Sequence, residues 1–390
     1  MKRKNMTDLQ NAIRNLQLNN KLVILRTCGN DRQKELLVAL AKDYTTVDMS
    51  LPNLRLQVEQ NPRLFLSSLR LPVYLANLQY TPSLLPALLS GGVPLAKVLV
   101  SCSQSYYLEA LAGQQETRKV VFGDLPLPQA DELNEPFAPT AACLANLRQK
   151  QQEVFTAVLW GTWDGCSEEL GAYISGLVQR EIMEQTTVSD AMKFYRFLCV
   201  AASMTGTVVN YSRLCSGVGI TAPTAKQWLQ FLAGTGMVYL LQPLGSLGSK
   251  RMVKAPKLYF RDTGAAAQLL QIGDVKTLVQ SFYLKNLFDN YVLNRLRESY
   301  LRQGKRARMM FYQDSNYKEI SLILRVDGVL YPVNICKDGY SVRKVQKSFE
   351  LLRGYAAEHG AALGSGCVIG TGGEIKLLAD NLYYLPAEYV

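Results

Sequence analysis

The chain has 390 residues, of which 48% are hydrophobic and 19% are charged, and its formal net charge is +11 at pH 7. This composition supports buried cores in two or three domains and excludes a wholly disordered chain. No apolar run approaches the ~20 residues that span a bilayer, and polar residues follow the basic N-terminus where a signal peptide would be apolar. We therefore expect a cytoplasmic protein with no membrane partner.

Strands and helices alternate over the first 139 residues. A helical pattern at 7–18 is followed by a predicted strand at 21–25, a turn at 27–32 and a helix at 33–43. Further strands are predicted at 44–48, 71–76 and 97–101. Apolar strands separated by helices are typical of a parallel α/β sheet. A proline-rich stretch at 125–139 ends this unit.

The middle of the chain is mostly helical as far as residue 204. A short helix at 212–216, a glycine-containing turn, a helix at 222–234 with Thr221 as its N-cap, and a strand at 237–241 follow. This order is typical of a winged helix, with residues 245–251 as its wing tip.

The excess positive charge is concentrated in this middle region. Residues 196–261 contain eight basic and no acidic residues, whereas residues 1–195 carry no net charge and residues 262–390 carry +3. Such a segment favours an anionic partner, and DNA is the candidate, against an ordinary basic surface or a docking module. Trp228 is expected in the core rather than as a platform for base stacking. The predicted nucleic-acid-binding residues are Arg213, Lys226, Gln227, Lys250, Arg251, Lys254 and Lys257.

The last third reads as another α/β unit. A helix is predicted at 281–301, strands at 309–313, 319–325 and 329–335, a helix at 341–358 and a strand at 366–369. Eight scattered cysteines without a Cys-x-x-Cys pair, and His359 as the only histidine, predict reduced thiols and no metal ion or cofactor. His359 is expected to be a solvated helix residue.

These elements, in this order, resemble the prokaryotic AAA-type ATPases that carry a winged-helix middle and a C-terminal domain related to PD-(D/E)xK nucleases. The resemblance covers nearly the whole chain and is densest at 194–198, 209–213, 221–229 and 254–264. It implies an α/β protein in three parts. They are a degenerate P-loop NTPase-like AAA domain at 1–139, a helical and winged-helix region at 140–256, and a restriction-endonuclease-like α/β domain at 257–390.

The resemblance also predicts that the nucleotide loop is degenerate. A phosphate-binding loop needs glycines, a lysine and a magnesium-binding hydroxyl. Here Thr27 and Arg32 replace the two glycines, Gln33 replaces the lysine and Lys34 replaces the hydroxyl. A shift by one residue does not restore the motif. The turn at Gly29 is expected to be structural, with anion binding there as the alternative.

Other positions of the family pattern are lost in parallel. Ala76 and Asn77 replace the Asp-Glu pair that holds magnesium and orients water, although Gln79 and Pro82 fit. Ser101-Cys102-Ser103 replaces Thr-Gly-Ser, and Gln114 replaces an arginine. In the nuclease-like part, Asp289 is the only candidate carboxylate. Metal-dependent nucleases need several carboxylates, so Asp289 alone is not expected to hold a catalytic metal ion. Glu319 is expected to be a solvated strand residue. The other degenerate nuclease positions are Ser321, Asn334 and Cys336.

The main hypothesis is thus a non-catalytic AAA-like protein that binds DNA or scaffolds a protein assembly, with a protein partner such as an active paralogue. The alternative is an active nucleotide-binding ATPase or a nuclease that uses a rearranged site. A third interpretation is a structural interaction protein that does not touch nucleic acid.

Overall fold

The computed structural model describes residues 3–19, 21–27, 31–91, 93–103, 108–109, 111–112, 119–125, 136–150, 153–163, 167–176, 178, 190–245, 253–303, 305, 308–314 and 318–390. The chain divides into two compact units, and each is described by itself. One comprises Met1–Pro128, Pro223–Val238 and Leu301–Lys305, and the other comprises Gln129–Ala222, Tyr239–Tyr300 and Arg306–Val390. The division at 1–139, 140–256 and 257–390 stays a prediction.

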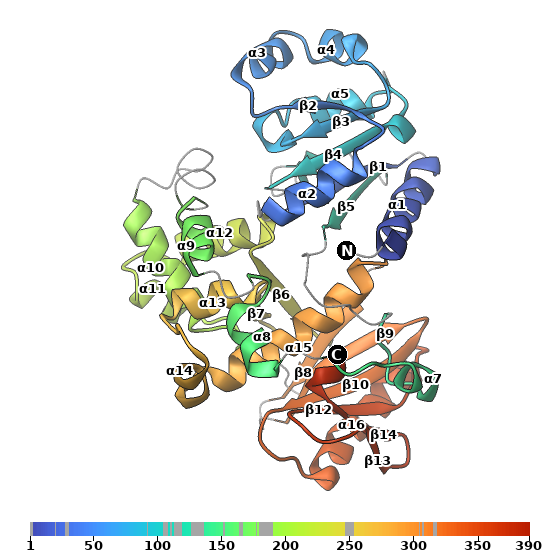
Figure 1. Ribbon diagram of the computed structural model, residues 1–390, viewed down its shortest axis with the longest axis vertical. Helices are drawn as coiled ribbons and strands as arrows, with labels where there is room; N and C mark the ends of the chain where they lie inside the picture. Colours follow the sequence, from blue (N-terminus) through green and yellow to red (C-terminus); the bar gives the residue numbers. More distant parts are fainter. Residues whose placement is uncertain are drawn as a thin grey trace. The chain divides into compact units, whose positions relative to one another are not determined.

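The first unit is built on a five-stranded sheet in the order β2-β3-β4-β1-β5 (Figure 1). Its strand pairs are parallel, so the expected parallel sheet is confirmed. Strand β5 was not expected from the sequence, because its apolar run covers only residues 120–122 before a glycine and an aspartate. The strands are β1 (Leu22–Arg26), β2 (Thr45–Asp48), β3 (Val73–Ala76), β4 (Val98–Cys102) and β5 (Val120–Asp124).

Helices cover both faces of this sheet because successive strand side chains point to opposite faces. Leu22 and Ile24 of β1 pack into a core with α3, α4 and α5, whereas Val23 and Leu25 pack with α1 and α2. The result is three layers. The helices are α1 (Arg3–Leu18), α2 (Asp31–Leu40), α3 (Pro52–Gln60), α4 (Pro62–Ser68) and α5 (Leu84–Leu89), with single 3₁₀ turns η1 (Leu78–Tyr80) and η2 (Leu95–Lys97).

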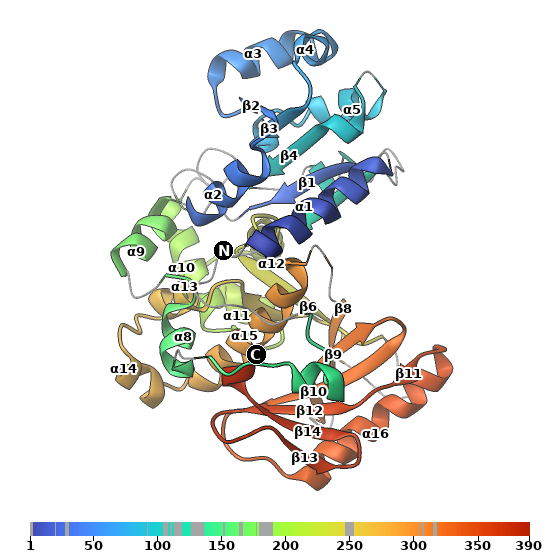
Figure 2. The ribbon, with the colours of Figure 1, turned by 45° about the vertical axis from the view of Figure 1, so that its right-hand side comes forward.

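The second unit contains a mixed sheet in the order β13-β14-β12-β10-β9-β8-β6-β7, with β11 paired to β10. Helix α16 (Val342–Glu358) buries its apolar stripe, including Phe349 and Leu352, against residues of β9, β10, β12 and β14 (Figure 2). The strands are β6 (Val238–Pro243), β7 (Lys257–Phe260), β8 (Arg308–Gln313), β9 (Glu319–Val326), β10 (Val329–Cys336), β11 (Ala362–Leu363), β12 (Gly366–Gly370), β13 (Lys376–Ala379) and β14 (Leu382–Pro386).

Five of these strands lie within two residues of their predicted ranges, namely β6, β8, β9, β10 and β12. Strands β7, β11, β13 and β14 were missed. β7 has only four residues, all buried, and its pattern resembles any short apolar run. β13 is mostly exposed and pairs only with β14, so neither gives a clean alternation.

The helical part of the second unit packs around α13 (Thr263–Leu269), which contacts α8, α9 and α10. Its N-cap Asp262 accepts hydrogen bonds from Ala265 N and from Thr162 N, each at 3.0 Å. A Cβ on Gly264 would lie 2.4 Å from the Trp160 carbonyl oxygen, so only glycine fits there. The remaining helices are α7 (Ala141–Ala145), α8 (Val154–Trp160), α9 (Ser167–Gly176), α10 (Ala191–Ala202), α14 (Val275–Gln280), α15 (Leu284–Leu301) and the 3₁₀ turn η4 (Ala387–Tyr389).

The predicted succession of helix, turn, helix and strand is present as α11 (Tyr211–Ser216), α12 (Ala222–Gly234) and β6. Asn210 caps α11 by accepting a hydrogen bond from Arg213 N at 3.1 Å. Most of the predicted wing tip, including Lys250 and Arg251, lies outside the described residues. Among the helices that the structure describes, none combines the length and the apolarity that a membrane-spanning segment requires.

Candidate functional site

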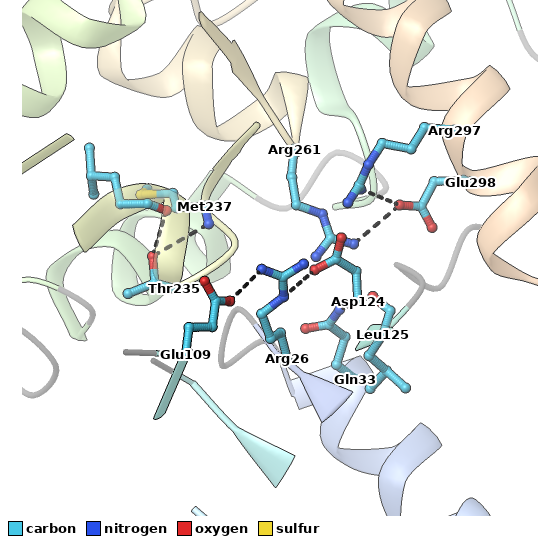
Figure 3. Close-up of polar contacts among 11 residues, drawn as sticks. Arg26, Gln33, Glu109, Asp124, Leu125, Thr235, Met237, Arg261, Arg297 and Glu298 are labelled. Atoms are coloured by element: carbon cyan, nitrogen blue, oxygen red, sulfur yellow. Dashed lines mark hydrogen bonds and ion pairs between the residues drawn. The ribbon is translucent and has the colours of Figure 1, made fainter. Parts of the chain in front are cut away.

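The carboxyl ends of the parallel strands are the first candidate region, because open α/β sheets bind ligands at this edge. Gln33, at the position of the expected lysine, is fully buried, and its Nε2 donates to the Leu125 carbonyl oxygen at 2.9 Å (Figure 3). Thr27 is buried as well, and its N–H donates to the Cys102 carbonyl at 2.9 Å. Lys34 is exposed, and the side chain of Arg32 lies outside the described residues.

Arg26, the last residue of β1, forms two ion pairs. Arg26 Nε lies 2.7 Å from Asp124 Oδ1 of β5, and its Nη1 lies 3.0 Å from Glu109 Oε1 (Figure 3). All three side chains belong to the first unit. The sequence reasoning missed this network. A charged residue at the end of an otherwise apolar strand was the available signal.

Neutral side chains join the ends of β2, β3 and β4. Asn77 has a left-handed backbone with φ of 60°, and its Nδ2 donates to Asp48 Oδ1 at 2.9 Å. Gln79 donates to Ser103 Oγ at 2.7 Å and accepts from Ser103 N at 3.2 Å. The resemblance expects acids at Ala76 and Asn77 to support magnesium and orient water, and Asn77 holds an amide there instead.

Asp48 is the one carboxylate in this hydrogen-bonded group, and the sequence reasoning did not single it out. Burial alone would raise its pKa, but hydrogen bonds from Asn77 and Ser50 and the charge of Arg55 outweigh burial, so the pKa of Asp48 is lowered. A carboxylate held ionised by neighbouring donors is a structural acceptor here.

The second candidate region is a charged cluster in the second unit. Lys257 Nζ contacts Glu319 Oε1, and Lys285 Nζ lies 2.9 Å from Asp289 Oδ2. The side chains of Lys257 and Asp289 are each 6% exposed, whereas those of Glu319 and Lys285 are 35% and 62% exposed. The structure therefore places Asp289 at the back of the cluster and Lys285 at its surface.

Burial raises the pKa of Asp289 to about 6, although Lys285 and Lys257 lower it. Oδ1 of Asp289 is buried and has no hydrogen-bond partner among the described residues. The thiol of Cys336 is affected by the same charges: burial raises its pKa, and Asp289 adds to the effect. These couplings place Asp289 and Cys336 in one electrostatic neighbourhood.

Two other expected nuclease positions hold strands together. Ser321 N donates to Asn334 Oδ1 at 3.3 Å, and Ile335 N donates to Ser321 Oγ at 3.2 Å. Both side chains thus satisfy backbone groups of β9 and β10. In the described part of the chain, no group of three or more His, Cys, Asp or Glu side chains is arranged to hold a metal ion.

The structure corrects the expectation for Lys257. It was predicted to lie on a nucleic-acid-binding surface, but it is 5% exposed and its charge is paired with Glu319. Glu319, expected to be a solvated strand residue, is this ion-pair partner. The physical reason is that β7, which begins at Lys257, is a buried strand.

Unlike Lys257, the other described residues that were predicted to bind nucleic acid are exposed. Arg213 is exposed on α11, Lys226 and Gln227 are exposed on α12, and Lys254 is exposed ahead of β7. Trp228 is 8% exposed and packs in a core, as expected.

A cavity of about 420 Å³ opens beside the charged cluster, within the second unit. Its charged lining residues are Arg213, Lys257, Lys285 and Glu319, and its neutral polar ones include Asn210 and Gln313. Arg213 comes from α11, whereas Lys285 and Glu319 come from α15 and β9. The tertiary structure therefore brings two residues predicted to bind DNA, Arg213 and Lys257, next to the predicted nuclease region.

A row of polar residues on α15 holds the segment that follows β7. Asn290, Asn294 and Glu298 are spaced four apart and therefore share one helix face. Asn294 Nδ2 donates to the carbonyls of Phe260 and Arg261 at 2.9 and 2.8 Å, and Glu298 Oε1 lies 3.2 Å from Arg261 Nη2 (Figure 3). This buried contact has a structural role.

Comparisons with known proteins match parts of the chain to a domain and to proteins of unknown function. Residues 165–276 match the family model described as Domain of unknown function (DUF8612). An uncharacterized protein of Mycobacterium bovis and another of Mycobacterium tuberculosis are each 27% identical over 124 residues, which is 32% of this chain and 28% of each relative. The chain thus matches less than a third of the length of these relatives. No solved structure matches.

Proposed function

We propose that this protein is an AAA-like binding protein that does not hydrolyse ATP and that acts as a scaffold or as a DNA-binding component. The single observation that carries the proposal is the burial and hydrogen bonding of the Gln33 side chain. A lysine at this position would have to reach the phosphates of a nucleotide, whereas the Gln33 side chain is turned into the protein and bonded to the Leu125 carbonyl.

The ends of the neighbouring strands support the same proposal. Hydrolysis needs an acid that holds magnesium and a second group that orients water. Asn77 and Gln79 offer amides at this edge, and both are already bonded to protein atoms. The strand order β2-β3-β4-β1-β5 is compatible with a P-loop-type sheet, in which the family pattern places these groups.

The test is magnesium-dependent phosphate release from ATP by the full chain, together with calorimetric titration of ATP. We expect no turnover above the rate without protein. Turnover that is abolished by Lys34→Ala and retained by Lys42→Ala would contradict the proposal, because Lys42 is an exposed lysine after the same helix.

DNA binding is the second candidate, favoured by the basic segment at 196–261, which lacks any acidic residue. Lys226 and Lys254 are exposed within it. We expect double-stranded DNA to bind with an affinity that falls as salt rises, because lysines release counterions from phosphates. Lys226→Gln and Lys254→Gln should each weaken binding, whereas Lys276→Gln, an exposed lysine on α14, should not. Binding that is indifferent to salt or to both changes would argue for a purely structural scaffold.

A further inference from the structure

The polar cavity in the second unit has the size of a small-molecule site. Its volume of about 420 Å³ falls within the roughly 300–1,000 Å³ of ligand pockets. Three of its lining side chains are cationic, Arg213, Lys257 and Lys285, and one, Glu319, is anionic. An anionic ligand is therefore the kind that this lining would attract.

The two lysines neutralise the carboxylates of the cluster. Lys257 contacts Glu319 and also acts electrostatically on Asp289, and Lys285 pairs with Asp289 at 2.9 Å. Buried carboxylates normally need a cation or a proton. Here ammonium groups meet that need, so the cluster does not require a divalent cation to be electrically balanced.

Arg213 is the cation that remains available. Its Nη2 donates to Ser203 Oγ at 3.3 Å, and no carboxylate in the described part of the chain pairs with it. A guanidinium presents a fork of donors that matches the oxygens of a phosphate. Arg213 thus faces the cavity with donors left for a ligand.

Gln313 adds an amide to the lining of the cavity. Its Oε1 is buried and has no hydrogen-bond partner among the described residues, although the residue lines the cavity. Buried polar atoms are nearly always bonded. Because the two ends of a glutamine amide are interchangeable by rotation, this side chain can offer a donor or an acceptor to a bound molecule.

We propose that this cavity binds the phosphate group of a ligand without a metal ion. Arg213 contacts the phosphate oxygens, Lys285 donates to them with the ammonium hydrogens that Asp289 does not accept, and Lys257 stays paired with Glu319. This inference does not depend on the proposed function at the strand ends of the first unit, because ATP turnover neither requires nor excludes it.

The test is calorimetric titration of the full chain, in EDTA, with three probes that carry the same chemistry: inorganic phosphate, deoxyadenosine 5′-monophosphate and a short 5′-phosphorylated single-stranded oligonucleotide. We expect saturable binding of at least one probe, and the probe that binds tightest identifies the source of the phosphate. Absence of saturable binding to all three, or binding that appears only when magnesium or manganese replaces EDTA, overturns the proposal.

Two variants locate the site. Arg213→Gln and Lys285→Gln should each weaken the tightest probe by about tenfold or more, since each removes a charge-assisted hydrogen bond. Both residues are exposed, so the fold should persist, which circular dichroism checks. Arg353→Gln is the matched control, because Arg353 is exposed on α16 and does not line the cavity. Weakening by the control as large as that by Arg213→Gln, or no weakening by either cavity variant, overturns the proposal.

Discussion

The strand ends of the first unit and the charged cavity of the second unit are both places where the sequence predicts lost catalysis, yet they have different structures. At the strand ends, Gln33, Asn77 and Gln79 donate to neighbouring protein atoms. In the cavity, Arg213 and Lys285 are exposed, and Gln313 has an unpartnered buried oxygen. The predicted loss of catalysis therefore coincides with a closed polar network in one unit and an open polar cavity in the other.

The largest effect is expected from Gln33→Ala. This change leaves the Leu125 carbonyl without its buried donor and creates a void, so it should destabilise the protein by about 2–3 kcal/mol. Urea denaturation measures this difference. Lys34→Ala, one residue along and exposed, should stay within about 0.5 kcal/mol of the parent. A Gln33→Ala variant as stable as the parent would show that this region is not the closed network described above.

The next effect concerns Asp289, whose pKa is raised to about 6 by burial. The folded state then binds a proton more tightly than the unfolded state, so the charge on Asp289 opposes folding above pH 6, and stability rises as the pH falls from 7 towards 4. Asp289→Asn should therefore stabilise the protein by about 1–2 kcal/mol near pH 7.5, and this gain should disappear by about pH 4.

The control for Asp289 is Asp274, which caps α14. Hydrogen bonds from Thr277 lower the pKa of Asp274, so its linkage has the opposite sign: its contribution is present at neutral pH and is lost as the pH falls. Denaturation of Asp289→Asn and Asp274→Asn at a series of pH values tests the contrast. A stability gain from Asp289→Asn that does not change with pH would show that the buried charge is not its cause.

The smallest effect is expected from restoring an acid at the strand ends. In Asn77→Asp, a second carboxylate would face Asp48 in place of a donor that now lies 2.9 Å from it. Repulsion and the lost hydrogen bond should destabilise the protein by about 1 kcal/mol at neutral pH. Stability should recover as one carboxylate takes up a proton on acidification. Asn77→Ala should also destabilise but show no such recovery, and equal pH profiles for the two variants would contradict the network.

Much of the first sheet could be predicted because its strands are short, apolar and separated by helices. β1 to β4 lie within two residues of their predicted ranges. β5 could not be predicted, since its apolar run covers only residues 120–122 and gives no periodic pattern. The same holds for β13, whose exposed residues depend on pairing with β14. Pairing between distant segments has no local signal in the chain.

The site residues divide in the same way. The sequence shows directly that position 33 is Gln33 rather than a lysine, and that Ala76 and Asn77 are not acids. The ion pair of Lys257 with Glu319 joins residues 62 positions apart, and no spacing rule connects them. Lys257 was therefore predicted to be a surface residue when the fold buries it.

The sequence alone determined which chemical groups are present: a parallel α/β unit with no acid at Ala76 or Asn77, eight basic and no acidic residues over 196–261, and a single histidine. These follow from residue identity and local periodicity, which do not need the fold. Only the tertiary structure decided that Arg213, Lys285 and Glu319 line one cavity and that Gln33 is buried. Burial and long-range pairing set the charge state and the accessibility of each group, and both arise only when distant segments pack together.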